Sequence, residues 1–150
     1  MVGGGKDREE MREILFRGKR KDNGEWVEGF YFCMVHDDGR HVHHFIMPLG
    51  ADLNLGTPIE KIQVEIDIET LCQYTGLTDK NGNKIWENDI VKCNYNDYGE
   101  KGTYIGKVIF REDTCTFIVT DEKSTDYEWW NEEKEVIGNI FDNHDLLKGE

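Results

Sequence analysis

The chain has 150 residues and a formal net charge of −13. This length is within the range of a single domain and can bury a core without disulfides. Ile and Val together number 22 and Ala and Leu 9, which favours strands and excludes helix bundles and coiled coils. No apolar run approaches the roughly 20 residues of a membrane span and no signal-peptide pattern is present, so we expect a soluble, cytoplasmic protein.

The first ten residues, MVGGGKDREE, form a glycine-rich and then charged leader without hydrophobic periodicity. We expect residues 1–10 to be disordered and exclude them from the fold. Their codons would be purine-rich, as in a bacterial ribosome-binding site, so Met11 is one candidate for the biological start. A cloning-derived leader is the other explanation of this composition.

The segment after the leader predicts a β-hairpin. An apolar run at Ile14–Phe16 is followed by the turn sequence Lys21–Gly24 and by a long return strand at Trp26–Val35. That strand is apolar on both of its alternating faces, which predicts that both faces are covered. A turn at His36–Arg40 leads to a third strand at His41–Met47.

The middle of the chain contains an irregular crossing and a further strand. The crossing runs from Pro48 to Pro58, the only two prolines. Residues 62–68 alternate apolar and polar side chains, as a half-buried strand does. We expect residues 69–74 to form a short helical turn.

The C-terminal half predicts short strands separated by turns. The Asn81-Gly82 dipeptide predicts a type I′ hairpin turn with positive φ at both residues. Strands are expected at 90–93, 103–111, 114–120 and 136–141, with a Gly- and Asn-rich loop after the first and a helical turn at 143–148. Strands at this spacing are typical of a small barrel.

Three segments have a distinctive order and spacing. They are RGKRKDNGEWV at 17–27, QYTGLTDKNG at 73–82 with IWENDIV at 85–91, and VIGNIF at 136–141. On these segments the chain resembles the YopX family of phages and prophages, from Met11 to about Leu147. The family signature corresponds here to Tyr74, Thr75, Gly76, Leu77, Asp79, Gly82, Asp89, Gly138 and Asn139.

The resemblance implies a mainly β protein with one or two short helical turns. It places an N-terminal β-rich lobe at residues 11–70, an SH3-like small β-barrel at 71–147 and a tail at 148–150. Two positions depart from the family pattern, since Asn88 replaces an expected Gly and His144 a frequent Pro. Asn tolerates the left-handed region, so we expect the turn at Asn88 to be kept. The family implies no activity.

The sequence contains no recognisable catalytic or cofactor-binding pattern. The only serine, Ser124, lacks a glycine elbow, and the segment Gly99–Lys107 lacks the Ser or Thr of a phosphate loop. The cysteines are too far apart for a zinc knuckle or a redox motif, so we expect reduced, packed thiols; they are Cys33, Cys72, Cys93 and Cys115. We therefore predict no enzymatic activity and no cofactor.

Two groups of residues resemble metal sites only in part. His41 and His43 share a strand face and lie near Asp37 and Asp38, but no third and fourth ligands are placed, so a solvated hairpin end is expected. A calcium-loop series has its glycine at the wrong position and Ile90 in place of the terminal glutamate. Its members are Asp79, Asn81, Asn83, Glu87 and Asp89.

Two sets of residues are candidates for an interaction surface. One is basic, and either contacts another molecule or pairs within the chain; it contains Arg17, Lys19, Arg20 and Lys21. The other is aromatic and contains Tyr127, Trp129 and Trp130. Its acidic neighbours disfavour nucleic acid, because stacking surfaces for single strands lie in basic grooves.

We therefore expect a non-enzymatic phage or prophage protein that contacts a host or phage protein. A lobe of about 50 residues buries too little surface to cover both faces of Trp26–Val35, so we also expect a homo-oligomer. One alternative is an acidic DNA mimic that inhibits a host nucleic-acid enzyme. Another is a nucleic-acid-binding small barrel with a basic strip at Lys84, Lys92, Lys101 and Lys107.

Overall fold

The computed structural model describes residues 12–51, 54, 56–121, 126–127 and 133–148, and it is mainly β, as predicted. The first of two antiparallel sheets has the order β1-β2-β3-β4-β5, and β1 also pairs with β4, so four strands form a closed ring. Its elements are β1 (Phe16–Arg20), β2 (Trp26–Val35), β3 (Val42–Pro48), α2 (Ile59–Ile62, before β4), β4 (Val64–Thr78) and β5 (Lys84–Trp86).

The second sheet has the order β10-β6-β7-β8-β9. Its elements are β6 (Asp89–Asp97), β7 (Glu100–Arg111), β8 (Thr116–Thr120), β9 (Asp126–Tyr127) and β10 (Glu133–Asn139), followed by the 3-10 turn η1 (His144–Lys148) that the sequence predicts. In the described residues no pairing joins β9 to β10, so the SH3-like closure expected for residues 71–147 is not seen there.

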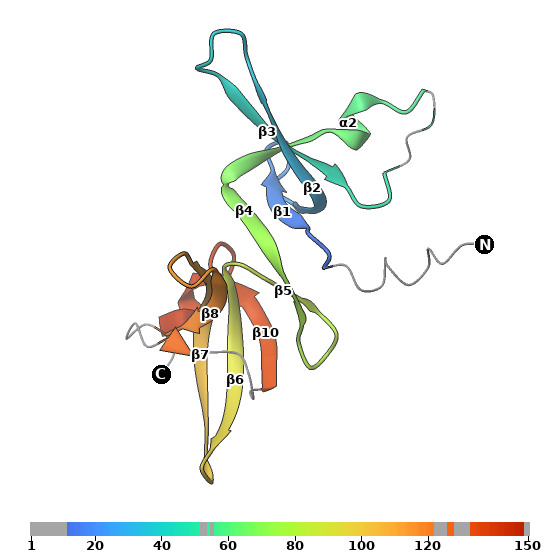
Figure 1. Cartoon of the computed structure of the whole chain (residues 1–150). Helices are drawn as coiled ribbons and strands as arrows, with labels where there is room; N and C mark the ends of the chain where they lie inside the picture. Colours follow the sequence, from blue (N-terminus) through green and yellow to red (C-terminus); the bar gives the residue numbers. More distant parts are fainter. Residues whose placement is uncertain (1–11, 52–53, 55, 122–125, 128–132, 149–150) are drawn as a thin grey trace, which may run out of the picture.

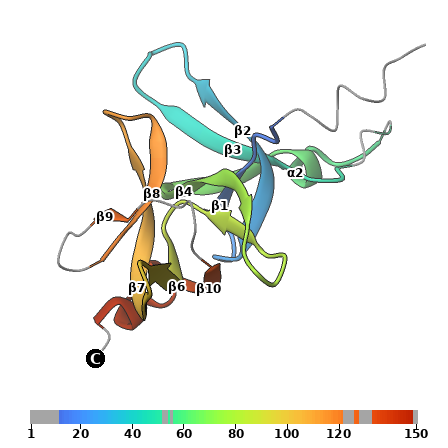
Figure 2. The same ribbon diagram turned by 60° about the horizontal axis from the view of Figure 1, so that its bottom comes forward.

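Strand β4 leads from one sheet to the other (Figures 1 and 2). The prediction of a helical turn at residues 69–74 is wrong, because this segment belongs to β4. Arg17 pairs with Cys72 on one side, and Tyr74 pairs with Trp86 on the other. Alternate residues of the segment are buried, which is the period of a strand and not of a helix. β4 also runs through the expected lobe boundary between residues 70 and 71.

Two turns differ from the prediction. The φ angle is positive at Gly82 (82°) but not at Asn81, and the Gly82 N–H donates to the Asp79 carbonyl at 3.0 Å. The type I′ assignment is wrong because the Asp79 carboxylate accepts the Asn81 and Asn83 N–H groups, both at 2.9 Å, and fixes another turn.

The prediction of a loop after residue 93 is also wrong, because β6 and β7 extend further and are joined by a connection of only two residues. Its residues, Tyr98 and Gly99, have φ angles of 48° and 88°, the pattern of a type I′ turn.

The interior consists of two apolar clusters of buried residues. One lies on the second sheet and includes Ile85 of β5; its members are Ile85, Val91, Cys93, Val108 and Val119. The other joins the two sheets and contains Leu15, Cys72, Tyr74 and Trp86, against which Trp26 and Phe141 pack. None of the four cysteines forms a disulfide, and the expected packing holds for Cys72 and Cys93 but not for the exposed Cys33 and Cys115. Within the described part of the chain, none of the helices has the length and apolar character needed to cross a membrane.

Candidate interaction surface

The far end of the β2–β3 ribbon extends beyond the rest of the first sheet (Figure 1). Pairing of β1 with β2 stops at Phe16↔Gly29, and β4 pairs with β3 only at Phe45 and Ile46. Residues 30–44, which we call the arm, are therefore a two-stranded ribbon. No strand of the described residues pairs with the outer edges of the arm.

One face of the arm is mostly apolar and partly exposed, with His43 as its polar member opposite Met34. Directly opposed residues of an antiparallel pair share a face, and here Phe30 lies opposite Met47 and Phe32 opposite Phe45. The rings of Phe32 and Phe45 stack with a centroid distance of 5.3 Å. Phe30 is 49% exposed and Met34 51%. The described residues therefore do not cover both faces of this strand, which the sequence predicts to be covered.

The opposite face of the arm is mixed. The Tyr31 hydroxyl and the His44 Nδ1 lie 2.7 Å apart, and burial raises the pKa of Tyr31. Val35, at the end of this face, is 58% exposed. Both faces therefore offer apolar contact area near the tip.

The strands of the arm lie in two uncharged segments of a strongly acidic chain. No Lys, Arg, Asp or Glu occurs from Gly29 to His36 or from His41 to Ala51, although the whole chain carries a net charge of −13. The charges of the arm are confined to the tip, at Asp37, Asp38 and Arg40.

The histidines of the arm form separate contacts with carboxylates. The His41 Nδ1 lies 2.6 Å from an oxygen of Asp38, and the His43 Nδ1 lies 2.9 Å from an oxygen of Glu65. The hydrogen bond from His43 lowers the pKa of Glu65. Among the described residues no three His, Cys, Asp or Glu side chains gather as a metal site, so His41 and His43 are not brought together with further ligands.

The basic residues of the first candidate surface have partners within the chain. Arg17 pairs with Asp89 at 2.6 Å, Lys19 contacts Asp142, and Arg20 pairs with Asp22 at 2.7 Å. Lys21 lies near Glu65 and contributes to its lowered pKa. Trp129 and Trp130, from the aromatic candidate set, lie outside the described residues. Tyr127 belongs to β9, opposite Val119.

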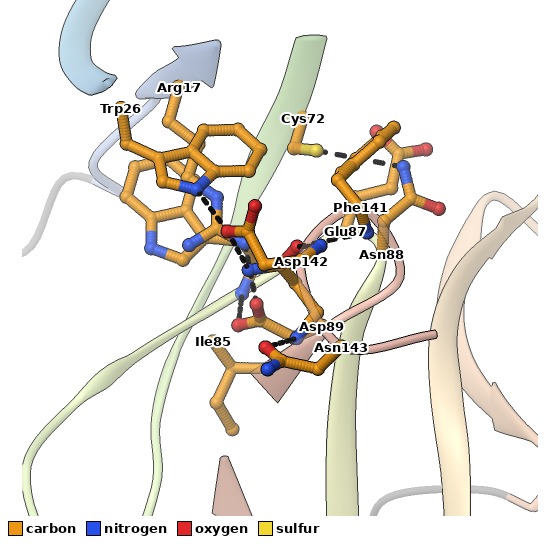
Figure 3. Close-up of polar contacts among 12 residues, drawn as sticks. Arg17, Trp26, Cys72, Ile85, Glu87, Asn88, Asp89, Phe141, Asp142 and Asn143 are labelled. Carbon is orange, nitrogen blue, oxygen red and sulfur yellow. Dashed lines mark hydrogen bonds and ion pairs between the residues drawn. The ribbon is translucent and has the colours of Figure 1, made fainter. Parts of the chain in front are cut away.

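Arg17 lies at the junction of the two sheets, which Figure 3 shows in detail. Its guanidinium carbon is 4.5 Å from the ring centroid of Trp26 and 5.3 Å from that of Trp86. Asp89 accepts from Arg17 and, at 2.8 Å, from the Trp86 N–H. Burial raises the pKa of Asp89 against the opposing effect of Arg17.

A second carboxylate joins the first hairpin to the C-terminal segment. Asp142 accepts hydrogen bonds from Lys19, from the Trp26 Nε1 at 2.8 Å and from the Asn139 Nδ2 at 3.1 Å. The hydrogen bond from Lys19 is the main cause that lowers the pKa of Asp142 to about 2. Nothing in the sequence signals the link from Asp142 to the first hairpin, since Lys19 and Trp26 are more than 100 positions away.

The other signature residues also support the junction. Besides its own turn, the Asp79 carboxylate accepts the Val136 N–H at 3.0 Å; burial acts to raise the pKa of Asp79, but the backbone donors lower it overall. The Thr75 hydroxyl donates to the Ile85 carbonyl at 2.8 Å. A Cβ at Gly138 would lie 2.6 Å from the Asn143 Oδ1. These three signature residues therefore form contacts within the β4–β5 hairpin and between it and the C-terminal segment, or within that segment.

Residues of the calcium-loop series and of the predicted basic strip have partners or acidic neighbours. Asp79 and Asp89 of the calcium-loop series accept hydrogen bonds from protein groups, as described above. Lys92 lies opposite Glu135 in the β6–β10 pairing, and the neighbouring Asn94 lies opposite Glu133. Acidic side chains therefore accompany the lysines of the predicted basic strip on this face. Lys84 lies apart, 3.8 Å from Glu28.

Comparison with known proteins gives one family and one similar structure among the matches. The family model described as YopX protein matches residues 15–148. The comparison with curated proteins gives no match. The crystal structure of protein EF1440 from Enterococcus faecalis is similar with a TM-score of 0.54 and 23% identity, over 91% of this chain and 99% of that one. This likeness concerns the fold.

Proposed function

The chain belongs to the YopX family, and on that premise we propose that it is a cytoplasmic phage or prophage protein that acts without catalysis, through protein–protein contacts. The arm is the contact surface, and the protein self-associates through it. The exposed apolar face of the arm carries this proposal. An isolated two-stranded ribbon is marginally stable in water, and an apolar patch on a ribbon marks a site that another molecule covers.

The buried titratable groups have structural partners. The two groups whose pKa is raised by the deepest burial are Asp89 and Cys72. Asp89 is held by Arg17 and the Trp86 N–H, and the Cys72 Sγ lies 3.6 Å from the Asn88 Nδ2. Structural networks of this kind perturb pKa values as active sites do.

Light scattering at micromolar concentration and moderate salt tests the proposal. We expect a multiple of the 17.5 kDa chain mass, and a lower mass for the double variant Phe30→Ser/Met34→Ser. Phe110→Ser is the matched control, because Phe110 is 41% exposed on the second sheet. Circular dichroism should show that all variants keep their strands. A wild-type mass of one chain would exclude self-association.

Salt separates the two physical causes of association. An interface held by apolar burial persists when the salt concentration rises, whereas one held by the Arg17–Lys21 run dissociates as the charges are screened. Because the arm strands are uncharged, we expect the oligomer to persist.

A further inference from the structure

The outer edge of β2 in the arm carries backbone groups that no described strand satisfies. In an antiparallel ladder, alternate residues direct both N–H and C=O to the same side. The Leu49 N–H donates to the Glu28 carbonyl at 3.0 Å, and the His36 N–H donates to the His41 carbonyl at 2.9 Å. These two bonds show that the even-numbered residues of β2 face β3.

The odd-numbered residues of β2 consequently face the other side. The first of them pair with β1, in agreement with the bond of 2.9 Å from the Arg20 N–H to the Glu25 carbonyl. Beyond Gly29 this side is open, and the backbone groups of Tyr31, Cys33 and Val35 point outward. An edge of this kind is a template for pairing with another strand.

We propose that this edge pairs with the same edge of a second copy, antiparallel about a two-fold axis that passes through Cys33. This inference rests on the proposed function, because it names the partner of the arm and the way that partner is bound. With the axis at Cys33, Tyr31 of each chain lies opposite Val35 of the other, and the two Cys33 residues lie opposite each other. This register uses all three outward-facing residues of both edges.

Side chains and charge favour this partner. In the same register, Phe32 of one copy lies opposite Met34 of the other on the apolar face, which extends the stack of Phe32 and Phe45. Two chains of net charge −13 repel each other, so their contact requires a surface without acidic side chains. The segment from Phe30 to Val35 is such a surface. Opposed aromatic and apolar residues stabilise paired strands.

The outer edge of β3 is a weaker template. By the same alternation, Val42, His44 and Ile46 direct their backbone groups away from β2, and Ile46 already pairs with Val64 of β4. Only two outward-facing residues are therefore open on β3, against three on β2. The isologous β2 contact offers more hydrogen bonds and a closed dimer.

Cross-linking of Cys33 tests the register. Opposed residues in a hydrogen-bonded antiparallel pair have Cα atoms about 5.5 Å apart, within the range of about 4.4–6.8 Å that a disulfide spans. Diamide accepts two electrons and two protons from two thiols, and it should convert the native protein to a dimer linked through Cys33. Cys33→Ser should abolish the linked dimer, and Cys115→Ser, which removes the other exposed thiol, should leave it unchanged.

Cys33→Pro tests the edge without relying on a disulfide. Proline removes the outward N–H and no bond to β3, and edge positions of this kind tolerate it. We expect the dimer dissociation constant to rise at least tenfold relative to Cys33→Ser, which keeps the N–H, while circular dichroism remains that of the parent.

The outcomes separate this inference from the proposed function. An oligomer that persists in Cys33→Pro and forms no Cys33 disulfide overturns the β2 pairing and leaves self-association standing. A wild-type monomer overturns both. A monomer that dimerises only after deletion of residues 1–11 overturns the inference as well, because it identifies the leader as the occupant of the edge.

Discussion

Arg17 of β1 and Asp89 of β6 are 72 positions apart in the sequence, and their side chains form an ion pair at 2.6 Å. Their side chains are 12% and 2% exposed, and the guanidinium lies against the rings of Trp26 and Trp86. The pair therefore joins the first hairpin to the second sheet in surroundings that exclude most water.

Removal of one partner should destabilise the protein strongly. Asp89→Ala leaves the Arg17 charge and the Trp86 N–H without their acceptor, and loss of one member of a buried pair costs about 3–5 kcal/mol. Urea unfolding measures this loss. Asp22→Ala, which removes the partner of Arg20 at the surface, is the control and should leave the unfolding midpoint essentially unchanged. Equal effects of the two variants would show that the junction pair is no stronger than a surface pair.

Asn88 should be replaceable by glycine but not by a β-branched residue. Its φ of 69° lies in the left-handed region, as expected from the sequence. Asn88→Gly should leave the melting temperature nearly unchanged. Asn88→Val should lower the free energy of unfolding by roughly 1–3 kcal/mol, and each kcal/mol lowers the melting temperature by about 2–4 °C. If both variants lose the same stability, the contact of the Asn88 amide with Cys72 matters more than the backbone.

Substitution of Gly82 should also destabilise the protein, for a purely conformational reason. Its φ is 82°, and a Cβ built there meets no atom within 4 Å, so no clash adds to the backbone cost. Gly82→Val should lower the melting temperature by at least about 2–4 °C, the shift for a loss of 1 kcal/mol, and Gly82→Asn by less. A change within about one degree for Gly82→Val would contradict the left-handed conformation.

Asp142 should contribute stability that disappears in acid. Its pKa is lowered from 3.8 to about 2, so the folded state binds a proton less readily than the unfolded state does. The contribution is complete above pH 4 and is lost as the pH falls towards 2. The side chain is 38% exposed, so solvent screening limits the effect to about 1 kcal/mol.

Denaturant unfolding between pH 6 and pH 2 measures this contribution. Asp142→Asn should be less stable than the parent at pH 6, and the difference should shrink below pH 4. Asp145→Asn is the control, because Asp145 is 96% exposed and pairs with Lys148 in the same turn. A constant difference between Asp142→Asn and the parent across this range would show that the charge of Asp142 is not the cause.

The sequence determined the features that depend on near neighbours. The turn before Trp26, the hairpin expected from strands at 103–111 and 114–120, the final turn expected at 143–148 and the left-handed Asn88 follow from local backbone preferences. The YopX motifs identified the family because their residues recur in a fixed order. None of these features depends on which distant strand packs beside the segment.

Only the tertiary structure decided the features that depend on distant partners. Residues 69–74 form a strand because β1 and β5 pair with their strand, and Asp79 fixes its turn with its own carboxylate. From the sequence alone, Arg17 and Lys19 are interpreted as part of a basic surface, whereas the structure places Asp89 and Asp142 beside them. The apolar strand Trp26–Val35 similarly predicted coverage, but only the end of the β1 pairing at Gly29 shows which edge stays open. Pairing partners and exposure are set by the packing of the whole chain, and a local pattern does not contain them.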